Sequence, residues 1–255
     1  MNDAVLFDAR ADGIAVITLN RPETRNCLDA DVRAGLYAAW DRFEHDPTLR
    51  VAVLTGAGDK AFCAGGDLKE MVDTGMRVPP PAMFPLPYDT VELSKPTIAA
   101  VNGAAFAGGW MIAQACDLCV ASTAATFAIT EVKVGRSSPW AAPLIHMIPQ
   151  RIMMELLLTG APITAGRAYE VGLVNRLAEP GAVLTAALEL AAEILRGAPL
   201  SVRAARDTVM LATEMGRSDA LRAARAAAVE CYDSADAQEG PRAFAEKRTP
   251  IWLGR

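Results

Sequence analysis

The sequence predicts an α/β protein in which a core of parallel strands and helices is followed by a purely helical region. Two short runs, VAVLT (51–55) and TIAAV (97–101), have the length and β-branched composition of strands that are buried on both faces. After about residue 183 the apolar residues take the spacing of amphipathic helices. We therefore expect a core at 1–182 and a helical region at 183–255.

The first elements are predicted to be a hairpin and a helix. Residues 5–9 and 14–19 flank Asp12-Gly13, a dipeptide typical of turns between antiparallel strands. A helix is then expected to begin at Asp29. Its apolar positions recur every three or four residues, at Val32, Leu36, Trp40 and Phe43.

The segment after the strand 51–55 contains a weak dinucleotide-binding pattern. Residues 56–61 (GAGDKA) fit G-x-G-x-x-A, but no helix is predicted to begin at Ala61. No acidic residue closes a second strand some 20 positions later, so a dinucleotide site is disfavoured. Residues 67–73 (DLKEMVD) are expected to be helical. The segment 74–92 carries five prolines and is expected to be irregular.

A third buried strand is expected at 118–121, and helices dominate the C-terminal region. In the first of these helices the predicted apolar face consists of Leu184, Leu188, Ala191 and Leu195. Gly197 is expected to end that helix, and Ser201 and Ser218 are expected to be the N-caps of two further helices. A helical region without a core of its own is typical of an oligomer interface or a lid.

Composition excludes several classes of protein. A net charge of −5 argues against nucleic-acid binding, and no 18-residue window is free of polar residues, which argues against a membrane span. The first residues lack the pattern of a secretory signal. The five cysteines are odd in number and lack zinc-type spacing, so we expect free, buried thiols, no metal and a cytoplasmic protein.

Two pairs of glycines stand where a strand is expected to give way to a helix. Gly65-Gly66 precede the helix 67–73, and Gly108-Gly109 follow the strand 97–101. The first N–H groups of a helix have no intrahelical acceptor. Such junctions in one parallel sheet point to the same edge, so together they predict an oxyanion hole. Each junction taken alone is also compatible with an ordinary glycine turn.

Oxyanion donors need a partner that handles a proton. His45 is expected to be solvated and His146 to be packed, and no G-x-S-x-G motif supports a serine hydrolase. Glu131 follows a stretch, 96–130, whose only formal charge is Asp117. Burial would raise the pKa of Glu131 toward the range of a general base. An exposed glutamate in a loop remains the alternative.

Six stretches, in this order, resemble the crotonase family, also called the enoyl-CoA hydratase/isomerase family. They are RPETRNCLD (21–29), VAVLTGAGDKAFCAGGDLKE (51–70), KPTIAAVNGAAFAGG (95–109), Asp117 in ACDL, FAITEVKVG (127–135) and LTGAPITAGRAYEVGLVN (158–175). The resemblance covers nearly the whole chain. The ending EGPRAFAEKRTPIW (239–252) is most similar to carnitinyl-CoA dehydratases and their nearest relatives.

The resemblance implies a superhelix of stacked ββα turns with a C-terminal region that forms trimers, often paired into hexamers. It implies an acyl-CoA thioester substrate, with coenzyme A as part of the substrate rather than a separate cofactor. The N–H groups of Gly66 and Gly108 would donate to the thioester carbonyl. The residues expected to contact coenzyme A or the acyl chain are Arg25, Ala64, Asp67, Leu68, Lys69, Met111, Pro139, Trp140, Phe244 and Lys247.

The chain departs from the family pattern at two places. Family hydratases carry two glutamates; the second corresponds to Glu131, but the first position is Met111, which accepts no proton. The glycine-rich stretch after Glu131 is replaced by GRSSPWAAP (135–143), so Arg136, Ser137 and Trp140 are expected to narrow or polarise the acyl pocket.

A single carboxylate base therefore predicts an enolate-forming lyase or isomerase. Two alternatives stay open. One is a catalytically silent acyl-CoA-binding protein. The other is an orthodox hydratase or dehydratase in which water or Ser137 replaces the second acid.

Overall fold

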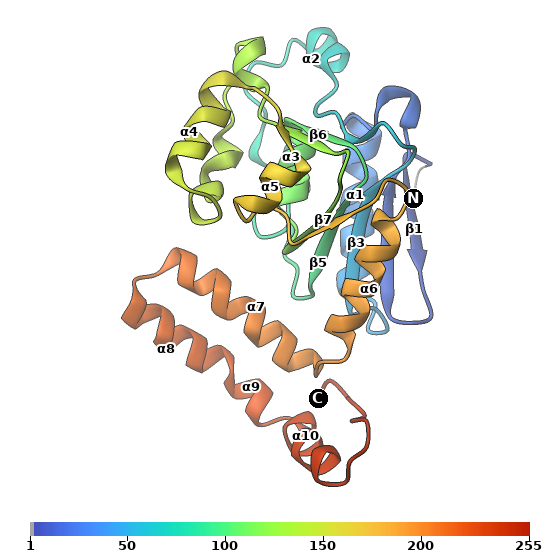
Figure 1. The fold of residues 1–255 in the computed structure, drawn as a ribbon, viewed down its shortest axis with the longest axis vertical. Coiled ribbons are helices and arrows are strands. Elements are labelled where there is room, and N and C mark those ends of the chain that lie inside the picture. Colours follow the sequence, from blue (N-terminus) through green and yellow to red (C-terminus); the bar gives the residue numbers. More distant parts are fainter. Residues whose placement is uncertain (1–2) are drawn as a thin grey trace. The chain divides into compact units, whose positions relative to one another are not determined.

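The computed structural model describes residues 3–255, which form two compact units (Figure 1). Unit 1 comprises the chain up to Leu93 together with Thr97–Ala191, and unit 2 comprises Ser94–Pro96 and Ala192–Arg255. The division falls inside helix α6 (Val183–Leu195), later than the expected boundary at 182. The first turns of this helix belong to unit 1, where Val183, Ala187 and Ala191 are buried.

The larger sheet of unit 1 has six strands in the order β1-β2-β3-β5-β7-β10. Their bounds are β1 Val5–Ala9, β2 Ile14–Leu19, β3 Val51–Gly56, β5 Thr97–Val101, β7 Leu118–Ser122 and β10 Arg176–Ala178. The first pair is antiparallel, which confirms the hairpin, and the other neighbours are parallel. Every residue of β3 and β5 is buried, as their continuous apolar character predicts.

A second sheet has four short strands in the order β4-β6-β8-β9. They are β4 Ala61–Cys63, β6 Ala104–Phe106, β8 Thr126–Ala128 and β9 Ile163–Thr164. The first three are parallel to one another. After GAGDKA the chain therefore enters a strand at Ala61, not the helix of a dinucleotide-binding fold.

The two sheets are built by one repeated path. A strand of the larger sheet leads to a strand of the smaller sheet and then to a helix. This path occurs as β3-β4-α2 and β5-β6-α3, and then as β7-β8 followed by the 3₁₀ helix η3. The stacked ββα turns expected from the sequence are therefore present.

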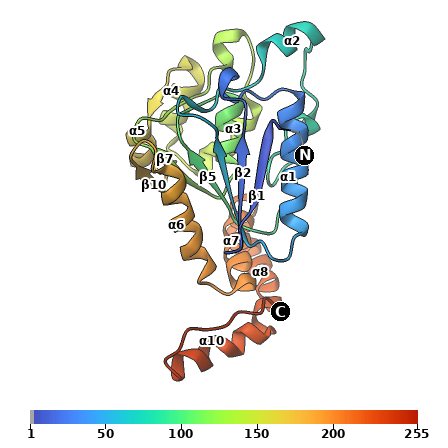
Figure 2. The same cartoon turned by 90° about the vertical axis from the view of Figure 1, so that its right-hand side faces the viewer.

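Helix α1 (Ala30–His45) covers the hairpin end of the larger sheet, where it contacts β1 and β2 (Figure 2). It begins where predicted, because the Asp29 carboxylate accepts a hydrogen bond from the N–H of Val32 at 3.0 Å. The four residues of its predicted apolar face, Val32, Leu36, Trp40 and Phe43, are all buried. Burial of this face holds the helix on the sheet.

The remaining helices of unit 1 are short. The α-helices are α2 Leu68–Thr74, α3 Gly108–Gln114, α4 Gln150–Thr159 and α5 Ala165–Glu170. The 3₁₀ helices are η1 Pro22–Thr24, η2 Pro81–Met83, η3 Glu131–Val134 and η4 Pro139–His146. Among the described residues of the proline-rich segment 74–92, η2 is the only helix after α2 ends, which confirms an irregular segment.

Asp117 anchors the proline-rich segment to the larger sheet. Its carboxylate accepts hydrogen bonds from the Tyr88 hydroxyl and, at 2.8 Å, from the N–H of Thr97. The Thr97 hydroxyl donates at 2.9 Å to Oδ2, the oxygen that also binds the Thr97 N–H. Asp117 thus ties the start of β5 to the start of β7, a structural role.

Unit 2 contains α7 (Pro199–Glu214), α8 (Arg217–Ala227), α9 (Val229–Tyr232) and α10 (Ala235–Ala245). Helices α7 and α8 pack against each other (Figure 1). The predicted N-caps are wrong, because Ser201 and Ser218 lie within the first turns and the caps are Ala198 and Gly216. In α7, Pro199 at the first helical position supplies the fixed backbone angle that starts the helix.

The predicted apolar face of α6 is partly wrong. Leu184 is 38% exposed, and the buried positions are Val183, Ala187, Leu190 and Ala191. Apolar residues surround most of this helix, so spacing alone does not select the packed face. Gly197 does not have a positive φ, and the helix ends through short-range bonds such as Gly197 N–H to the Ile194 carbonyl at 3.0 Å.

Among residues 3–255, no helix has both the length and the apolar character needed to cross a bilayer.

Candidate active site

Three chain segments meet at the carboxyl edge of the smaller sheet. Because β4, β6 and β8 are parallel neighbours, the residues that follow them emerge at the same edge. These residues are Ala64–Gly66, Ala107–Gly108 and Ile129–Glu131. The N–H of Ala107 donates to the Ala128 carbonyl at 2.8 Å, which joins two of the segments directly. The glycine junctions thus follow the short strands, which the sequence did not predict, and not β3 and β5.

The amides of Gly66 and Gly108 lie close together. A Cβ placed on Gly108 would stand 3.5 Å from the nitrogen of Gly66, and one placed on Gly65 would stand 3.4 Å from the nitrogen of Gly108. Among the backbone hydrogen bonds that residues 3–255 form outside regular helices and strands, none has the N–H of Gly66 or of Gly108 as its donor. Two unpaired donors side by side are what an oxyanion hole requires.

The turn into α3 is strained. Ala107, its N-cap, has φ 49° and ψ −121°, a conformation that favours glycine. Such backbone strain costs on the order of 1–3 kcal/mol and persists where surrounding contacts hold it. Here the hydrogen bond to Ala128 holds the residue. Sequence reasoning missed this feature because an alanine gives no signal for a positive φ.

Glu131 presents one partnered and one unpartnered oxygen. Its Oε1 accepts a hydrogen bond from the indole N–H of Trp140 at 2.9 Å. Its Oε2 is buried and has no hydrogen-bond partner among the described residues. Burial raises the pKa of Glu131, although its own backbone N–H and the Trp140 and Ser138 side chains act in the opposite direction. The carboxylate is therefore partly buried, not solvated in an open loop.

Met111 lies one turn after Gly108 in α3 and is 3% exposed. The neighbouring Trp110 packs edge-on against Phe127 of β8, with ring centroids 5.7 Å apart. The surroundings of α3 are therefore apolar at the position where family hydratases carry a glutamate. A thioether there offers no proton to a substrate.

The comparisons with known proteins cover nearly the whole chain. The family profile described as Enoyl-CoA hydratase/isomerase matches residues 9–255. The chain belongs to the enoyl-CoA hydratase/isomerase family. This is the family that the sequence motifs predict, also called the crotonase family, and the match confirms the predicted fold and the prediction of an enzyme. Membership implies acyl-CoA substrates.

Relatives that are named for an activity include hydratases and dehydratases. The chain is 41% identical to the (E)-benzylidenesuccinyl-CoA hydratase of Thauera aromatica, over 94% of this chain and 96% of that protein. It is 38% identical to a carnitinyl-CoA dehydratase of Citrobacter koseri over the full length of both. The crystal structure of an enoyl-CoA hydratase from Mycobacterium tuberculosis H37Rv superposes with a TM-score of 0.92, at 40% identity and with full coverage of both chains.

Several of the family's expected coenzyme A contacts are brought together in unit 1. The N–H of Ala64 donates to the carbonyl of Arg25 at 3.0 Å, which places the two segments side by side. Arg25 is exposed and lines a cavity of about 210 Å³. The other residues of that cavity are Pro22, Ala57, Gly58, Asp59, Lys60 and Ala61. Leu68 and Lys69 are exposed in the first turn of α2.

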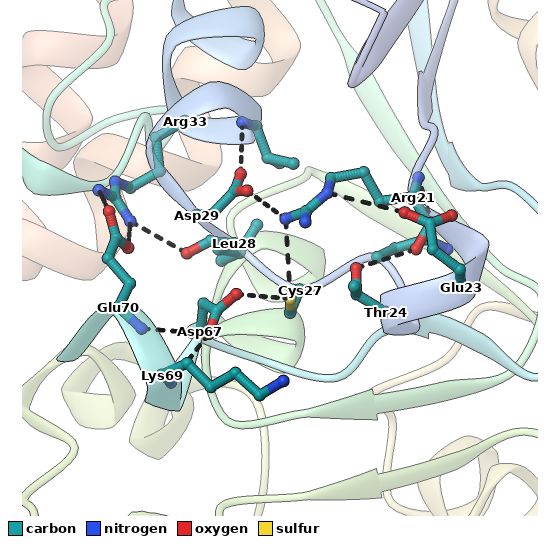
Figure 3. Close-up of polar contacts among 12 residues, drawn as sticks. Arg21, Glu23, Thr24, Cys27, Leu28, Asp29, Arg33, Asp67, Lys69 and Glu70 are labelled. Atoms are coloured by element: carbon teal, nitrogen blue, oxygen red, sulfur yellow. Dashed lines mark hydrogen bonds and ion pairs between the residues drawn. The ribbon is translucent and has the colours of Figure 1, made fainter. Parts of the chain in front are cut away.

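Asp67 fixes the start of α2. Its Oδ1 accepts hydrogen bonds from the N–H groups of Lys69 and Glu70, at 2.9 and 3.3 Å (Figure 3). Burial raises the pKa of Asp67, but these backbone donors, the Cys27 thiol and the charge of Arg21 together lower it below its ordinary value. The thiol of Cys27 lies 3.5 Å from Oδ2. Asp67 thus serves the helix cap with one oxygen and faces Cys27 with the other.

The residues after Glu131 are placed differently from one another. The guanidinium of Arg136 donates to the carbonyls of Met76 and Arg77, at 2.7 and 3.1 Å, so it tethers the proline-rich segment. Ser137 and Pro139 are exposed, whereas Trp140 is half-buried.

The two histidines are both exposed. The expectation that His146 packs is therefore wrong, and the expectation for His45 is confirmed.

Phe244 and Lys247 belong to unit 2. Phe244 is 87% exposed on α10, and Lys247, just beyond that helix, has φ 54°. Their contact with coenzyme A stays a prediction from the family pattern.

A bidentate ion pair connects α1 with α2 beside this region, and it predicts a pH-dependent stability. Arg33 donates to both oxygens of Glu70, at 2.8 and 2.9 Å, and the two side chains are 13% and 22% exposed (Figure 3). The hydrogen bonds from Arg33 lower the pKa of Glu70 below its ordinary value of 4.5. We expect Glu70→Gln to reduce the free energy of unfolding at pH 7 by about 1 kcal/mol.

The sign of the pH dependence follows from the lowered pKa. The pair contributes fully above the unfolded pKa of Glu70 and is lost as the pH falls through the lower folded value. Denaturant unfolding of the parent and of Glu70→Gln should therefore give curves that converge as the pH drops below about 4.5. A difference that stayed constant down to pH 3 would contradict the assignment.

Proposed function

We propose that this enzyme stabilises the enolate of an acyl-CoA thioester and uses Glu131 as its only carboxylate base. The observation that carries the proposal is the Glu131 carboxylate, whose buried Oε2 has no hydrogen-bond partner within residues 3–255. It follows β8 at the sheet edge that also carries the adjacent amides of Gly66 and Gly108. Met111 supplies no second acid or base.

In the proposed reaction the thioester oxygen accepts hydrogen bonds from the N–H groups of Gly66 and Gly108. Glu131 removes a proton from the α or γ carbon, and the electron pair of that C–H bond moves toward the carbonyl, which becomes an enolate. Each oxyanion donor contributes about 3 kcal/mol to lowering the barrier. The protonated Glu131 then returns its proton to another carbon of the conjugated system, or the enolate expels a leaving group.

Hydration or dehydration with one glutamate is the second candidate. It is favoured by the activities for which two relatives are named, a benzylidenesuccinyl-CoA hydratase and a carnitinyl-CoA dehydratase. It needs a second proton carrier, either water or Ser137, whose side chain is exposed. A catalytically silent acyl-CoA-binding protein is disfavoured, because such a protein has no need of a buried carboxylate that costs desolvation energy.

Proton exchange tests the proposal before any product is known. The protein is incubated with a panel of acyl-CoA thioesters in deuterated water, and the thioesters are examined by mass spectrometry and NMR. We expect deuterium at the α or γ carbon of at least one saturated or unsaturated acyl group, and none in the corresponding free acids. Addition of D2O to a double bond also places deuterium on the α carbon, but that product carries a new hydroxyl group. A panel in which deuterium enters only together with a hydroxyl would favour the second candidate, and a panel that stays unchanged would favour a silent binder.

Three further expectations belong to the proposal. We propose that the region from residue 183 onward assembles a homotrimer or a dimer of trimers. This is supported by exposed apolar side chains on α7 and α8, among them Val209 (63%) and Leu221 (49%). We also propose that Phe244 and Lys247, which lie in this C-terminal region, bind coenzyme A. A cytoplasmic location is supported by the five free cysteines. Three of them are buried as expected, but Cys27 and Cys231 are only half-buried, so the expectation is wrong for these two.

A further inference from the structure

Trp140 connects three elements around the proposed base. It lies in η4, and its indole N–H donates to Oε1 of Glu131 at 2.9 Å. Its backbone carbonyl accepts a hydrogen bond from Nε2 of Gln114 at 2.7 Å. Gln114 is the last residue of α3, the helix that begins with Gly108. Helix α3, Trp140 and Glu131 are thus linked by two consecutive hydrogen bonds.

We propose that Trp140 is a positioning residue: it binds Oε1 of Glu131 and so leaves Oε2 as the oxygen that takes the substrate proton. This inference rests on the proposed function, because it concerns how the base of that function is oriented. It adds a role to a residue that the family pattern places only beside the acyl chain.

The two oxygens of the carboxylate are not equivalent in this site. Oε1 is occupied by a directional N–H donor, while Oε2 is buried and finds no hydrogen-bond partner in the part of the chain that the structure describes. A carboxylate held at one oxygen loses rotational freedom, and so the other oxygen keeps a fixed direction. Gln114 binds the backbone carbonyl of Trp140, and this hydrogen bond fixes the backbone from which the indole projects. The orientation of the base is therefore set before substrate binds.

Among residues 3–255, no charged side chain contributes to the shift in the pKa of Glu131. Burial raises that pKa, and its own backbone N–H and the Trp140 and Ser138 side chains act in the opposite direction. Arg136, in the segment after Glu131, is bound to the carbonyls of Met76 and Arg77. Loss of the indole N–H therefore removes a main stabiliser of the charged carboxylate.

The decisive variant is Trp140→Phe, which keeps an aromatic ring and removes the donor. We expect its rate of deuterium exchange at pH 7 to fall about tenfold, while the KM for the acyl-CoA changes less than threefold. Without the indole N–H the pKa of Glu131 rises, so the acid limb of the pH–rate profile should move to higher pH. A merely structural defect would lower the rate at every pH and leave the limb in place.

Two more variants separate positioning from general damage. Gln114→Leu leaves the indole in place but frees its backbone, and we expect a smaller fall in rate with the same direction of shift. Trp40→Phe is the matched control, because it makes the same change at a fully buried tryptophan of α1. We expect it to lower the melting temperature but not to move the acid limb.

The outcomes distinguish this inference from the proposed function. A Trp140→Phe protein with the parent's rate and acid limb would overturn the positioning role, provided that Glu131→Gln abolishes exchange in the same assay. If Glu131→Gln also retained exchange, the proposed function itself would fail. If Trp140→Phe raised KM and lowered kcat without moving the limb, Trp140 would be a substrate contact and the inference would be wrong.

Discussion

Replacement of Glu131 by glutamine is expected to reduce deuterium exchange into the acyl group by about 10³-fold, within the range contributed by a positioned general base. The amide has nearly the same shape and still accepts the hydrogen bond from Trp140 through its carbonyl oxygen. It cannot take a proton at neutral pH. Affinity for the acyl-CoA should therefore change less than about threefold, which would place the whole loss in kcat.

Calorimetry with the same acyl-CoA provides the binding measurement for this variant. Glu155→Gln is a suitable control, because Glu155 is an exposed glutamate on α4 of the same unit. We expect that control to exchange protons at the parent rate. Exchange by Glu131→Gln within a few-fold of the parent would show that the base lies elsewhere, and the single-glutamate mechanism would be abandoned.

The parts of the fold that sequence predicts well are those with a continuous pattern of their own. The runs at 51–55 and 97–101 are apolar throughout, and α1 has an aspartate cap followed by four apolar residues on one face. Strands β4 and β6 have three residues each and no such pattern. They exist because each pairs with a neighbour distant in sequence, which is information that a local window lacks.

The candidate site shows the same division. The glycine pairs and Glu131 could be singled out because their residue types limit what they can do: glycine permits close backbone approach, and an ionisable group after an uncharged stretch invites burial. The bond from Trp140 to Glu131 could not be predicted, because the two residues lie nine positions apart in two different 3₁₀ helices, η4 and η3, which no regular sequence pattern relates. The serine caps failed for a related reason, since the proline at 199 and the glycine at 216 determine where those helices begin.

The second large effect is expected at Gly109, where α3 approaches β4 most closely. A Cβ at this position would lie 2.0 Å from the carbonyl oxygen of Cys63 and 2.7 Å from its carbonyl carbon. Both atoms belong to the backbone of β4, so no side chain can rotate away. The helix and the strand would have to separate, and we expect Gly109→Ala to reduce the free energy of unfolding by about 3 kcal/mol.

The same separation should disable the site in the molecules that remain folded. Gly109 is adjacent to Gly108, and Cys63 ends the strand that leads to Gly66, so moving α3 from β4 moves the two amides apart. Urea unfolding and deuterium exchange, measured on the same preparation, give both effects. Gly166→Ala in α5 is the matched control, since its added Cβ would have its nearest neighbour 3.9 Å away. That variant should stay within about 1 kcal/mol of the parent and keep its exchange rate. A Gly109→Ala protein as stable as the parent would mean that α3 does not pack against β4 this closely. The N–H groups of Gly66 and Gly108 would then not lie close enough to bind one oxyanion together.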